Sequence, residues 1–98
     1  MATVGYAEYG GALQHVLDIA CGPGIWALEV AFTYAQMKVV GIDPNRTLIR
    51  YAQVQARTQS LENVDFQVMD ALHDLDFPTH TFDLINAQFV DDRIPLHT

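Results

Sequence analysis

Short apolar segments alternate along this chain with segments whose apolar residues recur every three or four positions. The apolar segments are typical of strands, because they are nearly continuous, or alternate with polar residues in 64–69, and end at turn residues. They cover residues 15–19 (HVLDI), 38–43 (KVVGID), 64–69 (VDFQVM) and 82–87 (FDLINA). Strands that alternate with helices form parallel sheets joined by right-handed crossovers. The alternation therefore predicts an α/β domain.

Two helices are expected between the first three strands. The first covers residues 25–35, and its apolar stripe consists of Leu28, Ala31, Phe32 and Ala35. The second follows the helix-start residues Pro44 and Asn45, reaches about residue 59, and has the stripe Leu48, Ile49, Ala52 and Ala56. Residues 70–81 are expected to form mainly a loop before the last strand.

The composition limits the partners and the compartment. Half of the 98 residues (50%) are hydrophobic, which argues against disorder, and a net charge of −7 argues against binding to a phosphate backbone. A single cysteine, Cys21, excludes an internal disulfide framework. The first residues do not resemble a signal peptide, and no apolar run is long enough for a membrane helix. We therefore expect a cytoplasmic protein that binds neither nucleic acid nor a membrane.

The turn after the first strand is the strongest functional signal. In the segment DIACGPG, Gly22 and Gly24 allow a sharp turn and the close approach of a ligand to the backbone. The helix that follows would direct its N-terminal N–H groups toward such a ligand. The alternative is a tight turn that only connects two packed elements.

Asp43 ends the second strand, 19 residues after Gly24. In nucleotide-binding sheets of this kind, a carboxylate at this point binds a ribose hydroxyl. The alternative role is that of an N-cap for the helix that Pro44 opens. Because Asp43 occurs together with the glycine turn, we favour the ribose role.

A nicotinamide-binding enzyme is a competing interpretation, because GPGIWA satisfies the Gly-x-Gly-x-x-Ala pattern. Asp18 argues against it, since a carboxylate there would repel a pyrophosphate. A buried carboxylate needs partners, which a cofactor ammonium group or the N–H groups of the turn would supply. The alternative is that Asp18 only ties down its own loop.

Four segments in this order and spacing, VLDIACGPGIWALEVA, VVGIDPN, VDFQVMDA and FDLINAQF, resemble class I S-adenosylmethionine-dependent methyltransferases. The resemblance covers about residues 15–90 and is closest to the branch that methylates small molecules. It implies a Rossmann-like parallel sheet flanked by helices, truncated to about four strands in the order 3-2-1-4. Residues 1–14 would then be a flexible lead-in, 15–90 a partial cofactor-binding domain, and 91–98 an irregular tail.

The resemblance also implies which residues hold S-adenosylmethionine. The acidic glycine-rich turn of the family maps onto Asp18, Ala20, Gly22 and Gly24, and Ala20 departs from the first glycine of that motif. The ribose-binding acid maps onto Asp43 and the adenine-contacting acid onto Asp70, whose alternative role is to begin a loop. The residue under the methionine portion maps onto Asn86 or Gln88. The expected cofactor-binding set is Asp18, Ala20, Cys21, Gly22, Gly24, Asp43, Pro44, Asp70, Ala71 and Asn86.

The implied activity is methyl transfer from S-adenosylmethionine to a small-molecule acceptor in a complete enzyme, with this chain inactive alone. The alternatives are a non-catalytic S-adenosylmethionine-binding module or remnant and, less favoured, an NAD-dependent oxidoreductase fragment. No general base is identifiable, and Cys21 is expected to pack in its turn rather than act as a nucleophile. The histidines show no metal-ligand spacing, so no metal is expected.

The expected fourth strand, 82–87, would lie at one edge of the sheet. Edge strands and uncovered apolar side chains promote association between chains. We therefore expect self-association through this edge, where Phe82, Leu84, Ile85 and Phe89 would be partly uncovered. Asp83, in the same segment, is expected to have a structural role.

Overall fold

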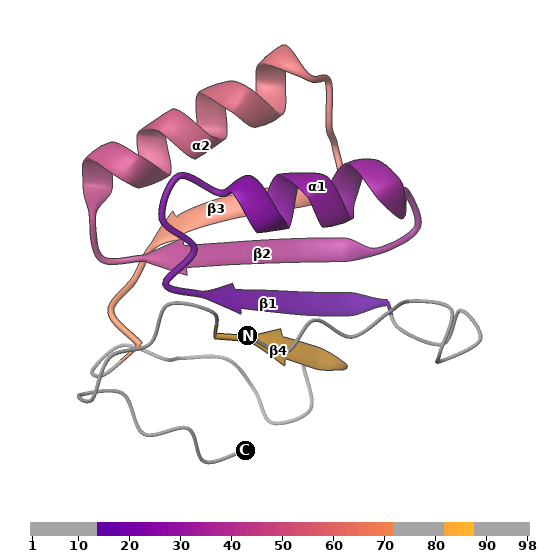
Figure 1. Ribbon diagram of the computed structural model, residues 1–98, viewed down its shortest axis with the longest axis horizontal. Helices are drawn as coiled ribbons and strands as arrows, with labels where there is room; N and C mark the ends of the chain where they lie inside the picture. The colour runs from indigo at the N-terminus through magenta and orange to yellow at the C-terminus, as the bar shows by residue number, and fades with distance from the viewer. Residues whose placement is uncertain (1–13, 72–81, 88–98) are drawn as a thin grey trace.

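The computed structural model describes residues 14–71 and 82–87, and these contain one parallel sheet and two helices. The elements in chain order are β1 (His15–Ile19), α1 (Ile25–Thr33), β2 (Lys38–Asp43), α2 (Arg46–Thr58), β3 (Val64–Val68) and β4 (Leu84–Asn86). The strand order is β3-β2-β1-β4, and every neighbouring pair is parallel. The expected fold and strand order are confirmed (Figure 1). The expected lead-in and tail, apart from Gln14, lie outside the described residues.

Both helices pack on the same face of the sheet (Figure 1). The connections from β1 to β2 and from β2 to β3 advance in one direction, so right-handed crossovers bring α1 and α2 to one side. The strand residues Val16, Val39 and Phe66 point into the core beneath these helices. The alternate residues Leu17 and Ile42 are buried on the opposite face. Burial on both faces explains why β1 and β2 are almost continuously apolar.

The ring of Phe66 occupies space that two glycines leave open. A Cβ atom built on Gly41 would lie 2.7 Å from this ring, and one built on Gly24 would lie 2.8 Å from it. Both distances are too short for real atoms, so the ring requires glycine at both positions. Phe66 therefore packs β3 against β2 and against the start of α1.

The first helix is shorter than expected, and two residues of its expected apolar stripe are exposed. The helix ends at Thr33, because Tyr34 leaves the helical conformation (φ −122°, ψ 82°) and the chain then turns; the N–H of Tyr34 makes the last helical hydrogen bond, to the carbonyl of Val30. The buried residues are Ala27, Leu28 and Ala31, whereas Phe32 is 72% exposed and Ala35 lies beyond the helix and is exposed. Phe32 lies beyond the edge of the stripe that meets the sheet.

The side chain of Asn63 ties together the loops at the amino edge of the sheet. Its amide nitrogen donates to the carbonyl oxygens of Ala31 (3.0 Å), Tyr34 (3.3 Å) and Met37 (2.9 Å). These carbonyls belong to the end of α1 and the loop before β2, where helix carbonyls lack partners within the helix. Asn63 thus replaces the glycine cap that often ends a helix.

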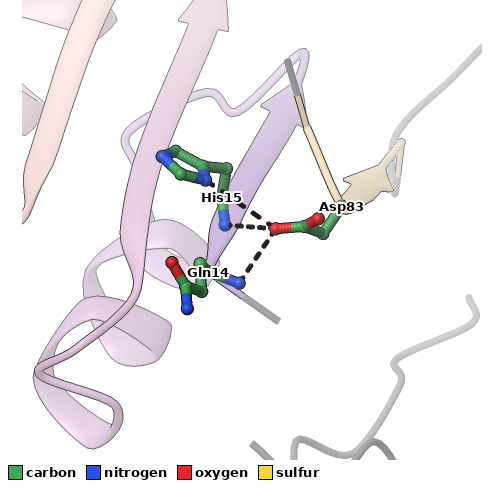
Figure 2. A network of polar contacts seen from close by, with 3 residues as sticks. All are labelled: Gln14, His15 and Asp83. Atoms are coloured by element: carbon green, nitrogen blue, oxygen red, sulfur yellow. Dashed lines mark hydrogen bonds and ion pairs between the residues drawn. The ribbon is translucent and has the colours of Figure 1, made fainter. Parts of the chain in front are cut away.

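Asp83 joins β4 to the start of β1, as Figure 2 shows. Its Oδ2 atom accepts hydrogen bonds from the backbone N–H groups of Gln14 (2.9 Å) and His15 (2.8 Å). The same oxygen lies 3.8 Å from Nδ1 of His15. The two backbone hydrogen bonds lower the pKa of Asp83. The structural role expected for this residue is confirmed.

Candidate functional site

The expected site residues gather at the carboxyl edge of the sheet. In a parallel sheet the carboxyl ends of all strands meet at one edge, which is where α/β proteins bind ligands. Asp18 and the turn 20–24 are at the end of β1, Asp43 and Pro44 at the end of β2, and Asn86 at the end of β4. Asp70 and Ala71 follow β3, whose end is joined to β2 by a hydrogen bond from Met69 N–H to the carbonyl of Asp43.

The turn after β1 contains three residues in the left-handed conformation. They are Ala20 (φ 57°), Gly22 (φ 58°) and Gly24 (φ 85°). Of the two glycines, Gly22 faces open space, since a Cβ atom on it would meet nothing within 4 Å. The glycine at position 24 is instead required by the packing of Phe66. A ligand can therefore approach the backbone at Gly22, whereas packing against Phe66 accounts for the glycine at position 24.

The carboxylate of Asp43 supports this turn. Its Oδ2 atom accepts a hydrogen bond from the N–H of Gly22 at 2.9 Å, and its Oδ1 atom accepts one from the N–H of Asn45 at 2.8 Å. Asp43 is not the N-cap of α2, so that alternative is wrong. The cap is Asn45, whose side chain accepts from the N–H of Leu48. A carboxylate has about four acceptor positions, so Asp43 retains the capacity to bind further donors.

Asp18 and Asn86 form a buried pair between adjacent strands. The two residues face each other in the β1–β4 register, and Nδ2 of Asn86 donates to Oδ1 of Asp18 at 2.9 Å. Burial, opposed by the hydrogen bond from Asn86 and assisted by the nearby charge of Asp43, raises the pKa of Asp18 to about 6. This pairing was not expected from the sequence. The available signal was a polar residue in each of two apolar strands.

Cys21 lies in the turn, but its side chain points into the core beneath the helices. Its backbone N–H donates to the carbonyl of Ile42 at 2.9 Å. Burial, together with the charges of Asp18 and Asp43, raises the pKa of its thiol to about 12. The expectation that Cys21 packs in its turn is confirmed.

The start of α1 faces the same edge of the sheet. Gly24 is the N-cap of this helix and has no side chain to accept a hydrogen bond, and the first turn holds no acidic residue. The N-terminus of α2, in contrast, is capped by Asn45. The dipole of α1 therefore places partial positive charge beside the open backbone at Gly22.

Neither a metal centre nor a membrane span occurs in the part of the chain that the structure describes. In residues 14–71 and 82–87, no three His, Cys, Asp or Glu side chains are grouped to hold a metal ion. Neither described helix has the length and apolar character needed to cross a membrane. A cavity of about 610 Å³ lies at the opposite, amino edge of the sheet, between Met37, Lys38 and Asn63, far along the strands from the glycine turn.

Comparison with known proteins gives a consistent result. The family model described as "Methyltransferase domain" matches residues 16–94. The demethylmenaquinone methyltransferase of Porphyromonas gingivalis is 34% identical over 76 residues, which are 76% of this chain and 31% of that protein. The chain spans about a third of the length of the curated relatives that it matches.

Solved structures of similar chains share the fold. The YcgJ protein from Bacillus subtilis has a TM-score of 0.69 and 32% identity, covering 78% of this chain and 31% of that one. PKMT2 from Rickettsia typhi, solved in complex with AdoHcy, has a TM-score of 0.69 and 31% identity, covering 76% of this chain and 14% of that one. With its glycine turn, its acid at the end of β2 and the family match over most of its length, the chain belongs to the class I S-adenosylmethionine-dependent methyltransferases.

Proposed function

We propose that the carboxyl edge of this sheet binds S-adenosylmethionine for methyl transfer to a small-molecule acceptor. The observation that carries the proposal is the arrangement of Gly22 and Asp43. The glycine leaves its backbone open to a ligand, and the acid that holds it in place is the acid expected to bind a ribose.

The residues at this edge fit the chemistry of the cofactor. Asp43 would accept hydrogen bonds from the ribose hydroxyls with the acceptor positions that the backbone N–H groups do not use. Asp18, buried and without a described cation beside it, would accept from the ammonium group. Asp70 and Ala71, at the end of β3, would contact the adenine, and Pro44 would lie beside the ribose. Ala20, Cys21 and Gly24 would contribute through the backbone of the turn.

S-adenosylmethionine, when bound, supplies an electrophilic methyl group on a sulfonium centre. The chain would contribute by orientation, since such a transfer depends largely on the alignment of the two reactants. The rigid turn held by Asp43 and the packing of Phe66 beneath it would fix the position of the donor. No described side chain is assigned as a general base.

The small-molecule acceptor is proposed by analogy. One similar protein is a demethylmenaquinone methyltransferase, and the chain is 34% identical to it. Because the chain spans about a third of such relatives, the acceptor and the activity of the whole protein belong to the proposal. A non-catalytic S-adenosylmethionine-binding module is the second candidate, and it shares the same cofactor site.

Calorimetric titration of the chain with S-adenosylhomocysteine, S-adenosylmethionine and NAD tests the proposal. We expect binding of both S-adenosyl compounds and none of NAD. A preference for NAD, or no binding of either S-adenosyl compound, would overturn it. In the complete protein, transfer of a radiolabelled methyl group to small quinols distinguishes an enzyme, which produces labelled product, from a binding module, which does not.

A further inference from the structure

Asp18 and Asn86 are separated by 68 residues in the sequence but form one buried unit. Asp18 is 2% exposed and Asn86 is 5% exposed, and the hydrogen bond between their side chains is 2.9 Å long. Buried carboxylates require hydrogen-bond donors, and an amide donor favours the ionised form of the acid. Asn86 therefore contributes to the state of Asp18 as well as to the pairing of β4 with β1.

Among the described residues, the groups that shift the pKa of Asp18 include no cationic side chain, so none balances its negative charge. β2 presents the carboxylate of Asp43, β4 presents the neutral amide of Asn86, and the turn presents the neutral thiol of Cys21. The charge of Asp43 opposes the ionisation of Asp18, and burial opposes it more strongly. A carboxylate in this setting gains most from a ligand that brings its own positive charge.

We propose that Asn86 is a positioning residue that holds the Asp18 carboxylate, ionised and correctly oriented, for a cationic ammonium group of the ligand. The inference rests on the proposed function, because that ammonium belongs to the amino-acid portion of an S-adenosyl ligand. Asn86 acts through Asp18 rather than by touching the ligand. Its amide fixes one oxygen of the carboxylate, so the plane of the group is set before the ligand arrives.

The arrangement links ligand binding to a proton. In the ligand-free chain the carboxyl of Asp18 has a pKa of about 6. A bound ammonium group lowers the pKa of a neighbouring acid. Below about pH 6 the ligand must displace a proton to bind, so its affinity falls as the pH decreases. Above about pH 7 Asp18 is already ionised, so the affinity becomes constant. Loss of the Asn86 amide would move this transition to higher pH.

Two ligands isolate the effect. S-adenosylhomocysteine carries the amino-acid portion, whereas 5′-methylthioadenosine has the same adenosine and thioether but no ammonium group. At pH 6.5 we expect Asn86→Ala to weaken the affinity for S-adenosylhomocysteine by roughly tenfold, the size expected for one lost charged hydrogen bond. The affinity for 5′-methylthioadenosine should not change. Equal losses for the two ligands would overturn the inference.

Two further variants provide the controls. Asn63→Ala also removes an asparagine amide that ties elements together, but at the amino edge of the sheet. It should lower the stability and leave the affinities for S-adenosylhomocysteine and 5′-methylthioadenosine unchanged. In an Asp18→Asn background, Asn86→Ala should cause no additional loss of S-adenosylhomocysteine, because the two residues act as one unit. A persistent loss in that background would show that Asn86 acts independently of Asp18.

The unaltered chain offers a test that does not depend on the folding of any variant. Its affinity for S-adenosylhomocysteine should fall as the pH decreases from 7 to 5, while that for 5′-methylthioadenosine should remain flat. Parallel profiles for the two ligands would overturn the inference and leave the proposed function standing. Absence of binding by both ligands would overturn the proposed function, and the inference with it.

Discussion

The carboxylate of Asp43 accepts a hydrogen bond from the backbone N–H of Gly22, so the acid that ends β2 also holds the turn that follows β1. The distance is 2.9 Å, and Asp43 is 8% exposed. The two features by which the site was identified in the sequence are thus in direct contact. A change in either residue should affect the other.

Asp43→Ala should therefore reduce both stability and ligand affinity. Loss of two hydrogen bonds to a buried charged acceptor should cost about 2–4 kcal/mol of unfolding free energy. Loss of the proposed ribose contact should also weaken the affinity for S-adenosylhomocysteine by about tenfold or more. Denaturant titration and calorimetry measure the two effects. Asn45→Ala is the matched control: it removes the cap of α2, costs about 0.5–2 kcal/mol and should leave affinity unchanged.

Alanine at the two glycines of the turn should give opposite results. Gly24→Ala should destabilise the fold by several kcal/mol, because its Cβ would lie 2.8 Å from the ring of Phe66 and the backbone is left-handed. Gly22→Ala meets no neighbour and should cost only about 1–2 kcal/mol of backbone strain, but it should obstruct the ligand. Circular dichroism melts and calorimetry distinguish the two. Retained ligand affinity in Gly22→Ala would contradict the placement of the ligand.

Ala20→Gly should stabilise the fold by about 0.5 kcal/mol. Alanine is strained by about 1–2 kcal/mol in the left-handed conformation, and the greater freedom of glycine in the unfolded chain offsets part of the gain. Ala31→Gly, inside α1, provides the contrast and should be destabilising. Thermal melts of the two variants should therefore move in opposite directions. A lower melting temperature for Ala20→Gly would mean that the methyl group contributes packing that exceeds its strain.

Asp18→Asn should stabilise the ligand-free chain at neutral pH. The pKa of Asp18 is raised from 3.8 to about 6 in the fold, so the folded state holds this proton more tightly than the unfolded state. Stability is therefore lost as the pH rises through this range, by up to roughly 3 kcal/mol at neutral pH. The advantage of Asp18→Asn should disappear below about pH 4. Asp83→Asn should behave in the opposite way, since its pKa is lowered and its contribution is lost on acidification.

We expect the chain to self-associate through the edge of β4, and Ile85→Lys should weaken that association. β4 pairs with β1 and with no other strand in the described residues, and Ile85 is 45% exposed on it. A lysine on an edge strand opposes pairing with another chain. Sedimentation velocity over a range of concentrations measures the effect. Tyr51→Lys, at an exposed position of α2, adds the same charge elsewhere and should leave association unchanged. An equal effect of the two substitutions would indicate a general influence of charge.

The strands were predictable because their signals are local. β1 and β2 have the bounds expected from the sequence, since a strand buried on both faces is apolar throughout and ends at turn residues. The end of α1 was not predictable, because apolar spacing continues through Phe32 and Ala35 after the helix has stopped. The carboxyl-edge placement of Asp18 and Asp43 followed from parallel strand order alone.

The contacts within the site depend on tertiary structure and were not visible in the sequence. The pairing of Asp18 with Asn86 requires the register between β1 and β4, which no local pattern encodes. The packing role of Gly24 depends on the ring of Phe66, which comes from a strand two places away in the sheet. The sequence indicated two glycines that a ligand could approach, and the structure leaves open space at Gly22 but packs Phe66 against Gly24.

The placement of one aromatic ring over two glycines restricts how this sequence can diverge. Gly41 has no left-handed backbone, so an alanine there becomes acceptable once position 66 holds a smaller side chain such as leucine. Gly24 has no such route, because a Cβ atom there would still lie 2.9 Å from the Cβ of Ala52 when the ring is gone, and the left-handed backbone adds strain. In a library that randomises positions 24, 41 and 66 together, the variants that fold should keep glycine at 24. Among them, a larger side chain at 41 should occur together with a smaller one at 66.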